Sequence, residues 1–122
     1  MGTREPTERR KQKRFKSREG AFVALRLRGS KLGQIVDISA RGLAFRYIDI
    51  GERPRGTFEL DILFRDKEFH LERVPAKTVS DSESAEAFPF SATKTRRHSV
   101  QFGDLTDDQV SQLAYFIKHY TT

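Results

Sequence analysis

The sequence contains no cysteine among its 122 residues. Disulfide bonds, metal sites built from thiolates and a cysteine nucleophile are therefore excluded. Its longest apolar run is far too short to cross a bilayer. The N-terminal stretch MGTREPTERRKQKR also lacks the apolar segment of a secretory signal. We therefore expect a cytoplasmic protein without a membrane span.

The usual arrangements of catalytic residues are missing as well. His70, His98 and His119 lie far apart in the sequence and fit no metal-ligand spacing. No nucleophile–base pair, phosphate-cradling glycine loop or isolated carboxylate pair stands out. We therefore expect no catalysis, no metal and no cofactor, and we favour structural or surface roles for the histidines.

Positive charge is concentrated at the start of the chain. The net charge is +6, but residues 1–31 hold 11 Lys or Arg against 3 Asp or Glu, a net charge of +8. A basic arm before a nearly neutral domain suggests an anionic partner, such as a nucleotide, a nucleic acid or an anionic membrane surface. Taken alone, however, such an arm is better explained as a solvated tail.

The body of the chain shows the two-residue alternation of short strands. The expected strands are residues 21–28, 34–38, 42–48, 57–64, 68–74 and 98–103. In the clearest, TFELDILF, four apolar side chains share one face, whereas Glu59 and Asp61 are expected to face water. Pro75 is expected to interrupt its strand at a bulge or an edge, and residues 80–88 are expected to form a polar loop.

The last segment is predicted to be a helix over about residues 106–119. Thr106 and Gln109 fit a capping box at its start. An apolar stripe with helical spacing is expected to pack on the sheet. It comprises Val110, Leu113, Ala114 and Ile117 and is widened by Tyr115, Phe116 and Tyr120. Five or six short strands followed by one helix predict a small antiparallel β-barrel with a helical plug.

The stretch DISARG, which follows an apolar run, has two interpretations. In an extended strand Asp37 and Ser39 would project outward, whereas Val36 and Ile38 would pack inward. Gly42 suits a tight turn or a close backbone approach. Because Asp and Ser side chains often cap turns, a turn is the better explanation of this stretch alone. The other interpretation is a ligand site.

The basic arm adds a second pattern, R-x-x-x-R, formed by Arg10 and Arg14. This pattern, a short strand and then D-x-S-x-x-G together resemble the PilZ domain family. Three further stretches extend the resemblance over roughly residues 8–120: the strand GAFVAL, the hairpin GQIVDISARGLAFRYI and the ending HSVQFGDLTDDQVSQLAYFI. The resemblance implies a single stand-alone domain, with a flexible basic arm at 1–18 and a six-stranded antiparallel β-barrel with a C-terminal helix at 19–122.

The resemblance also implies a non-catalytic bacterial receptor for the second messenger cyclic di-GMP. Arg10 and Arg14 would clamp the ligand, because an arginine fork suits a phosphate or the O6/N7 edge of guanine. Asp37, Ser39 and Gly42 would form the fixed wall, with Asp37 accepting hydrogen bonds from guanine. Ordering of the arm on binding would pass the signal to an unidentified downstream protein.

Several further arginines belong to this hypothesis. Arg9, Arg18 and Arg41 are candidate secondary contacts, although Arg41 also suits a solvent-facing position. Arg14 and Arg18 also satisfy R-x-x-x-R, so the working pair stays open, with Arg10 and Arg14 favoured by the position of Phe15. The arginines at 96–97 fit either the ligand surface or a solvated basic turn.

Two other functions remain as alternatives. A basic arm on a small barrel is also typical of a nucleic-acid-binding protein, although the periodicity of the aromatic residues buries most of them. A PilZ-like domain that binds only protein is the other alternative, and the intact arginine and D-x-S-x-x-G patterns argue against it.

Overall fold

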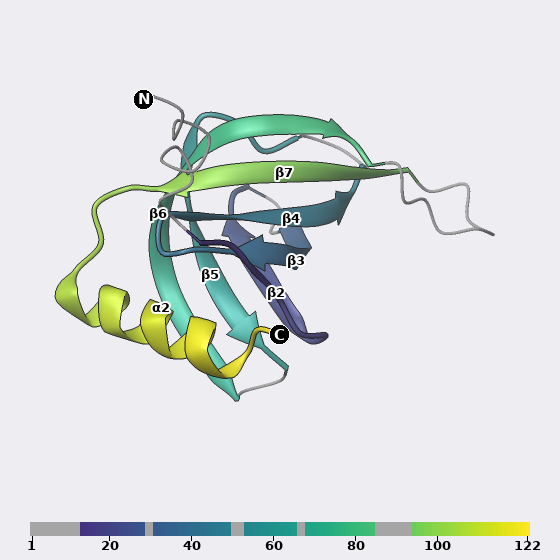
Figure 1. Ribbon diagram of the computed structural model, residues 1–122. Coiled ribbons are helices and arrows are strands. Elements are labelled where there is room, and N and C mark those ends of the chain that lie inside the picture. The colour runs from purple at the N-terminus through teal and green to yellow at the C-terminus, as the bar shows by residue number, and fades with distance from the viewer. Residues whose placement is uncertain (1–12, 29–30, 50–52, 66–67, 85–93) are drawn as a thin grey trace, which may run out of the picture.

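The computed structural model describes residues 13–28, 31–49, 53–65, 68–84 and 94–122. Within these ranges the chain forms seven strands and one helix (Figure 1). The elements are β1 (Phe15–Lys16), β2 (Ala21–Arg26), β3 (Lys31–Ile38), β4 (Gly42–Ile48), β5 (Thr57–Phe64), β6 (Phe69–Glu83), β7 (Thr95–Phe102) and α2 (Asp107–His119).

Six of the strands close into an antiparallel barrel. They are hydrogen-bonded in the order β3-β2-β5-β6-β7-β4, and β4 pairs back onto β3. β1 is an additional short strand on β3, with Phe15 opposite Ile38. The predicted six-stranded barrel with a C-terminal helix is therefore confirmed.

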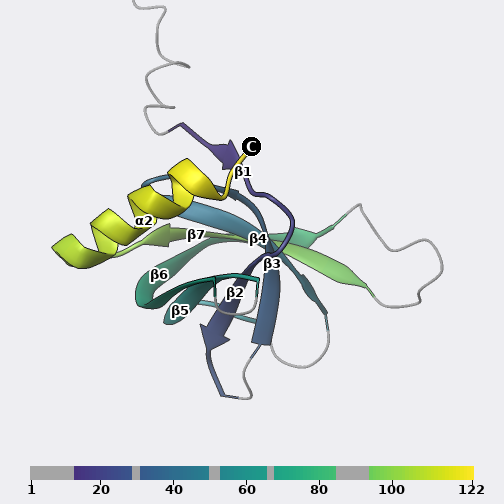
Figure 2. The same ribbon diagram turned by 90° about the horizontal axis from the view of Figure 1, so that it is seen from below.

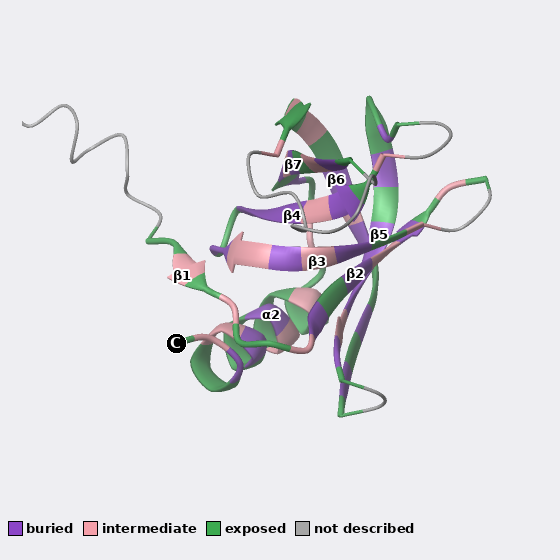
Figure 3. Ribbon diagram, turned by 90° about the vertical axis from the view of Figure 1, so that its right-hand side faces the viewer, coloured by how far each residue is buried: buried purple, intermediate pink, exposed green. Residues whose placement is uncertain are grey.

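The core fills the barrel with the apolar positions of the alternating strands. In β5, Phe58, Leu60, Ile62 and Phe64 are all buried, as their two-residue spacing predicts. Figure 3 shows buried segments on every strand from β2 to β7 and on the side of α2 that faces the barrel. The helix therefore completes the core at one mouth of the barrel.

The start of α2 follows the predicted capping box. The Gln109 backbone N–H donates to Thr106 Oγ1 at 3.1 Å, and the Thr106 N–H donates to Gln109 Oε1 at 3.0 Å. The same Gln109 side chain donates to the backbone oxygens of Glu72 and Arg73 at 3.1 and 3.0 Å. One residue therefore caps the helix and fastens it to β6.

The face that α2 buries differs from the predicted stripe. Leu113 and Phe116 are buried, but Val110 is 52% exposed and Ala114 is also exposed. The mouth of the barrel offers aromatic rings, and the Phe116 ring lies edge-on to that of Phe69 at 5.3 Å. Because aromatic rings bury more apolar area than Val or Ala, they determine the orientation of the helix. The expectation for Val110 and Ala114 was wrong.

β6 is longer than the sequence indicated. It continues through Pro75, which stands opposite Glu59, and ends only at Glu83. The expected polar loop at 80–88 is therefore wrong for residues 80–83, and residues 85–88 lie outside the described ranges. Residues 80–83 pair with β7, whereas β5 pairs only as far as Lys77. The part of β6 that extends beyond β5 does not cover the barrel core and needs no apolar face. Its polar sequence therefore resembles that of a loop.

Asp61 does not face water as expected. It lies on the outer face of β5 and is only 6% exposed, because the Arg26 side chain covers it. Arg26 Nε donates to Asp61 Oδ1 at 2.7 Å, and Arg26 Nη2 donates to Asp61 Oδ2 at 3.0 Å. His70 Nε2 and the Arg73 backbone N–H complete the cluster at 2.9 and 3.0 Å. Burial alone would raise the Asp61 pKa, but these hydrogen bonds outweigh it and hold the pKa at about 2.

The two ends of the described chain lie side by side (Figure 2). The Thr122 N–H donates to the Lys16 carbonyl oxygen at 2.9 Å, and the Arg18 N–H donates to the Tyr120 carbonyl oxygen at 3.0 Å. Ser17 and Thr121 form an antiparallel bridge between these bonds. Residues 15–18 of the basic arm are therefore part of the folded structure, between β3 and the tail that follows α2.

Candidate functional site

The carboxylate of Asp37 is held between two arginines near the end of β3. Arg14 Nη1 donates to Oδ1 at 2.5 Å, and Arg97 Nη2 donates to Oδ2 at 3.2 Å. The Asp37 side chain is 21% exposed, and the two guanidinium side chains are about half exposed. Exposed ion pairs of this kind contribute about 0–1 kcal/mol each. An incoming anion can therefore replace either pair at small cost.

The pairing of the strands explains how these residues meet. β1 places Lys16 opposite Asp37, so that Arg14 lies just before the paired residues of the arm. On the other side, Asp37 pairs with Ala44 on β4, which in turn pairs with Ser99 on β7. Arg97 lies two residues along β7 and reaches diagonally across β4. The small side chain of Ala44 leaves room for this crossing.

Ser39 forms the turn that follows Asp37. Its hydroxyl accepts hydrogen bonds from the backbone N–H groups of Arg41 and Gly42 at 3.1 and 3.2 Å. Its own N–H donates to the Gly42 carbonyl oxygen at 2.8 Å. The residue is 2% exposed, so the expectation that it projects outward beside Asp37 is wrong. The turn interpretation of DISARG therefore describes its local structure.

A β-bulge explains why simple alternation failed in this strand. The pairing of β3 with β4 shifts between Ile35 and Asp37. Ile35 and Ile38 are both buried, whereas Val36 between them is only partly buried. The expected inward packing was right for Ile38 and wrong for Val36. A bulge inserts one residue into the strand and moves the following side chains to the other face.

Gly42 is required by the approach of two strands. A Cβ atom at this position would lie 2.2 Å from the Val100 carbonyl oxygen on β7. Its φ angle is not in the left-handed region, which among the described glycines occurs at Gly20 and Gly56. The close backbone approach expected at this glycine is therefore an approach to β7.

The remaining candidate arginines take different positions. Arg41 is exposed, and its carbonyl oxygen accepts a hydrogen bond from the Phe102 N–H at 2.7 Å. The Arg18 guanidinium reaches the His119 carbonyl oxygen at 3.3 Å, at the end of α2. Arg9 and Arg10 lie outside the described residues. Among the described candidates, the structure brings Arg14 to Asp37 and leaves Arg18 with the helix.

Arg97 is the member of this cluster that sequence reasoning did not single out. The sequence indicates it only as one of two arginines, at 96–97, that fit either the ligand surface or a solvated basic turn. Its proximity to Asp37 depends on the register of β7 against β4, which places Arg97 opposite Arg46. A basic residue on a strand that neighbours the D-x-S-x-x-G hairpin is the sequence feature that could have identified Arg97. It can be recognised only when the order of the strands in the barrel is known.

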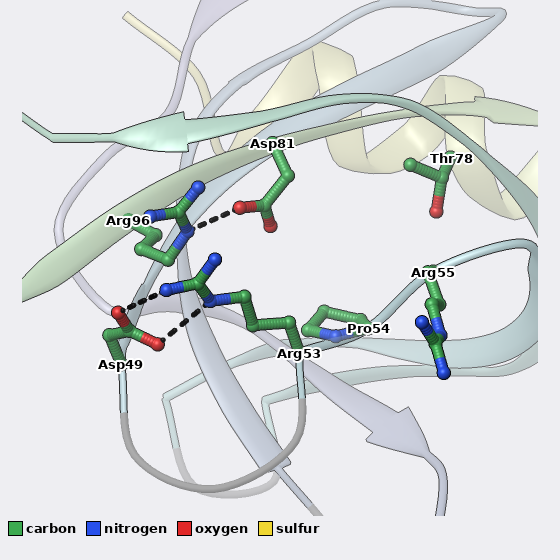
Figure 4. Close-up of a pocket in the computed structure, with 7 residues that line it drawn as sticks. All are labelled: Asp49, Arg53, Pro54, Arg55, Thr78, Asp81 and Arg96. Atoms are coloured by element: carbon green, nitrogen blue, oxygen red, sulfur yellow. Dashed lines mark hydrogen bonds and ion pairs between the residues drawn. The ribbon is translucent and has the colours of Figure 1, made fainter.

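A second polar cluster lies at the mouth of the barrel away from α2 (Figure 4). Asp81 accepts hydrogen bonds from Tyr47 Oη at 2.6 Å, from His98 Nδ1 at 2.7 Å and from Arg96 Nε. Burial raises the Tyr47 pKa well above its usual range, and the bond to Asp81 raises it further. His98 is fully buried, and its Nε2 lies 3.1 Å from Thr78 Oγ1. This network joins β4, β6 and β7 beside a cavity of about 650 Å³.

One group of described side chains has the donor atoms for a metal ion. The ligand atoms of Asp61, His70 and Glu72 lie within 4.8 Å of one another. However, the Arg26 guanidinium bonds to both oxygens of Asp61 and lies 3.7 Å from the Glu72 carboxylate. A guanidinium thus already supplies the positive charge, and these residues do not fit a metal site.

Comparison with known proteins identifies the fold. No protein-family model matches the sequence, and no curated protein matches it. Among solved structures, the PilZ domain of YcgR from Escherichia coli with c-di-GMP is similar at a TM-score of 0.75 and 19% identity, over 92% of this chain and 91% of that one. The chain has the PilZ-domain fold.

Two longer structures are also similar. YcgR from Escherichia coli in complex with c-di-GMP has a TM-score of 0.67 at 19% identity, over 90% of this chain and 45% of that one. MrkH, described as a c-di-GMP-dependent transcription regulatory factor, has a TM-score of 0.67 at 15% identity, over 89% and 49%. The present chain thus spans less than half of each. Within the described ranges, no helix is long and apolar enough to cross a membrane.

Proposed function

We propose that this chain is a non-catalytic receptor for cyclic di-GMP in the bacterial cytoplasm. The observation that carries the proposal is the cluster in which Asp37 meets Arg14 from the basic arm and Arg97 from the barrel. The cluster lies on a fold shared with two solved proteins whose descriptions name c-di-GMP as a bound ligand or regulator. Asp37 and Arg14 belong to the sequence patterns D-x-S-x-x-G and R-x-x-x-R.

The chemistry of the cluster suits a guanine nucleotide with two phosphates. An arginine fork can bind a phosphate or the O6/N7 edge of guanine, and its plane can stack on a base. Asp37 can accept hydrogen bonds from the N–H donors of guanine once its arginine partners turn toward the ligand. Because the ion pairs with Asp37 are exposed and weak, this exchange costs little.

Ser39 and Gly42 contribute mainly by supporting the wall of the site. The buried Ser39 hydroxyl fixes the turn that follows Asp37, and Gly42 lets β4 approach β7. The exposed side chain of Arg41 is available for a secondary contact at the same turn. In this proposal the serine and the glycine of D-x-S-x-x-G act through the backbone, and Asp37 acts on the ligand.

We propose Arg10 and Arg14, rather than Arg14 and Arg18, as the working pair. Arg14 already contacts Asp37, whereas Arg18 is directed to the carbonyl oxygen of His119 at the end of α2. Arg10 would complete the clamp, with Arg9 as a further phosphate contact. Arg18 would then hold the arm against the helix.

The signal would pass to a downstream protein through the arm. Residues 15–18 are fixed to β3 and to the tail of α2, so ligand-dependent ordering concerns the residues before them. The ligand can shift the arm only by its differential affinity for the two arrangements. Exchange of Arg14 from Asp37 to a phosphate is the step that would make this difference.

Isothermal titration with cyclic di-GMP tests the proposal, with GTP and cyclic di-AMP as controls. We expect selective binding of cyclic di-GMP and a loss of at least about tenfold in affinity in Asp37→Ala, because the guanine acceptor is removed. Asp104→Ala, which removes an exposed aspartate after β7, is the matched control and should bind like the parent. Unchanged binding by Asp37→Ala would refute this site assignment.

The same titration separates the alternatives. A nucleic-acid-binding barrel would show steep salt dependence, little preference for the cyclic dinucleotide and little effect of Asp37→Ala on polyanion binding. Absence of any nucleotide binding at moderate salt would leave a domain that binds only protein.

A further inference from the structure

We propose that the groove between α2 and the basic arm binds an amphipathic, acidic helix of the downstream protein. This inference rests on the proposed function for its regulatory part, because that part needs a nucleotide at Asp37. The groove has a volume of about 700 Å³ and is lined by α2, by the arm and by the turn that contains Ala40.

The groove uses the apolar helix face that the barrel leaves uncovered. Val110, Ala114 and Ile117 line it from α2, and Phe15 lines it from the arm. Val110 is 52% exposed, although the sequence pattern predicted burial. α2 therefore has two apolar faces: one fills the mouth of the barrel, and the other, which is exposed at Val110 and Ala114 and partly buried at Ile117, borders the groove.

The shape of the groove suits a helix better than an extended segment. Val110, Ala114 and Ile117 follow the spacing i, i+4 and i+7, which forms a ridge of about 10 Å along α2. The small Ala114 in the middle leaves a hole for a side chain of the partner helix. An extended segment would need a free strand edge, but β1 already pairs with β3 and, through Lys16, with Thr122.

The charges around the groove favour an acidic partner. Lys13 and Lys118 line it beside the apolar residues, and Lys13 lies over the Phe15 ring at 5.7 Å. A second copy of this chain would bring its own lysines and its net charge of +6 to the same surface. Residues 1–12 contain only Met1 and Pro6 as larger apolar side chains, and their net charge of +2 has the same sign as Lys13 and Lys118.

The groove shares its walls with the proposed nucleotide site. Phe15 follows Arg14, which binds Asp37, and Ala40 belongs to the turn closed by Ser39. Movement of Arg14 toward a phosphate would therefore displace Lys13, which precedes it and lines the groove, while Phe15 stays paired with Ile38. If the nucleotide changes the affinity of the groove for the helix, thermodynamic linkage requires the helix to change the affinity for the nucleotide by the same factor.

A synthetic amphipathic peptide of about 18 residues can serve as the probe, because this length supports partial helicity. It carries Leu at i, i+3, i+4 and i+7 and Glu at the flanking positions, and a second peptide carries Lys in place of Glu. Fluorescence anisotropy with the full chain should show binding of the acidic peptide, and binding of the basic peptide at least about tenfold weaker.

Variants of α2 locate the binding. Val110→Glu should weaken binding of the acidic peptide at least about tenfold, because it puts a charge in the apolar groove and repels the flanking Glu residues. Ser111→Glu adds the same charge to the adjacent exposed position outside the groove and should bind within about twofold of the parent. Circular dichroism checks that both variants remain folded, and Ala114→Leu, which fills the groove without a charge, should weaken binding as well.

Three outcomes would overturn the docking proposal: no binding of the acidic peptide, equal binding of both peptides, or no effect of Val110→Glu and Ala114→Leu. Titration of Val110→Glu with cyclic di-GMP should give the parent affinity, which separates the two proposals. If cyclic di-GMP does not bind but the peptide results are as expected, the receptor proposal is refuted and the docking proposal is supported. If both bind but neither changes the affinity for the other, the coupling through Arg14 and Lys13 is refuted.

Discussion

Replacement of Gly42 by alanine tests whether the glycine of D-x-S-x-x-G serves the sheet or the ligand. The added Cβ would lie 2.2 Å from the Val100 carbonyl oxygen, whereas ordinary contact begins at 3.4 Å. β4 would therefore have to move about 1.2 Å away from β7 at this position. The neighbouring bond from the Phe102 N–H to the Arg41 carbonyl oxygen, now 2.7 Å long, would stretch beyond hydrogen-bond range.

The cost of this movement follows from two contributions. Overpacking of a close contact costs about 1–3 kcal/mol, and each lost hydrogen bond costs about 1 kcal/mol. We therefore expect Gly42→Ala to lower the free energy of unfolding by about 2–4 kcal/mol. For a domain of this size that corresponds to a decrease in Tm of about 8–15 °C.

Thermal and urea denaturation followed by circular dichroism measure this decrease. Gly103→Ala is the matched control, because an added Cβ would lie 3.2 Å from the Pro75 side chain and 4.0 Å from the Pro75 carbonyl oxygen, which is ordinary contact. We expect Gly103→Ala to cost less than about 1 kcal/mol. If Gly42→Ala is as stable as the parent, the close approach of β4 to β7 is refuted. If Gly42→Ala is destabilised but binds cyclic di-GMP normally when folded, the glycine serves the sheet alone.

Three further substitutions test the polar contacts. Asp61→Asn should reduce the loss of stability in acid. The Asp61 pKa of about 2 lies below the ordinary 3.8, so its stabilisation of about 1–2 kcal/mol is present above pH 4 and lost as the pH falls toward 2. Urea titrations at pH 6 and pH 2.5 should therefore show a smaller difference in the variant. Gln109→Ala should lower the free energy of unfolding by about 1–2 kcal/mol, measured by thermal denaturation. The control Gln112→Ala loses only a contact within α2 and should lower it by less than half as much. Equal decreases would contradict the bond from α2 to β6. Tyr47→Phe should cost about 1–1.5 kcal/mol, and an unchanged Tm would show that the hydroxyl does not support Asp81.

Local sequence patterns predicted the elements whose structure depends on local interactions. The strand from Thr57 to Phe64 has an uninterrupted two-residue alternation, and its apolar side chains fill the barrel as expected. The capping box of Thr106 and Gln109 uses groups only three residues apart, so its geometry follows from the sequence alone. The barrel could be expected from the number and spacing of such elements.

Features that depend on partners distant in sequence could not be predicted. A bulge at Val36 has no sequence mark, and Ser39 is buried because its hydroxyl accepts backbone hydrogen bonds in the turn after β3. Arg97 reaches Asp37 only because β4 lies between their strands and carries a small residue there. The orientation of α2 depends on rings at the mouth of the barrel, which the helical periodicity does not include. The sequence could identify Asp37 and Arg14 as candidates, but it could not decide whether Arg97 belongs to the ligand surface or to a solvated turn.

The antiparallel seam between the arm and the tail has a mechanical consequence. Its bonds, from Thr122 to Lys16 and from Arg18 to Tyr120, lie one after another along the seam. A force that pulls residue 13 away from residue 122 would load them singly, as a zipper opens, rather than together. The arm can therefore be peeled off at low tension while the closed barrel resists. If the domain is tethered at both ends, stretching the tethers would detach Phe15 and disturb the surface around Asp37 before any barrel strand separates.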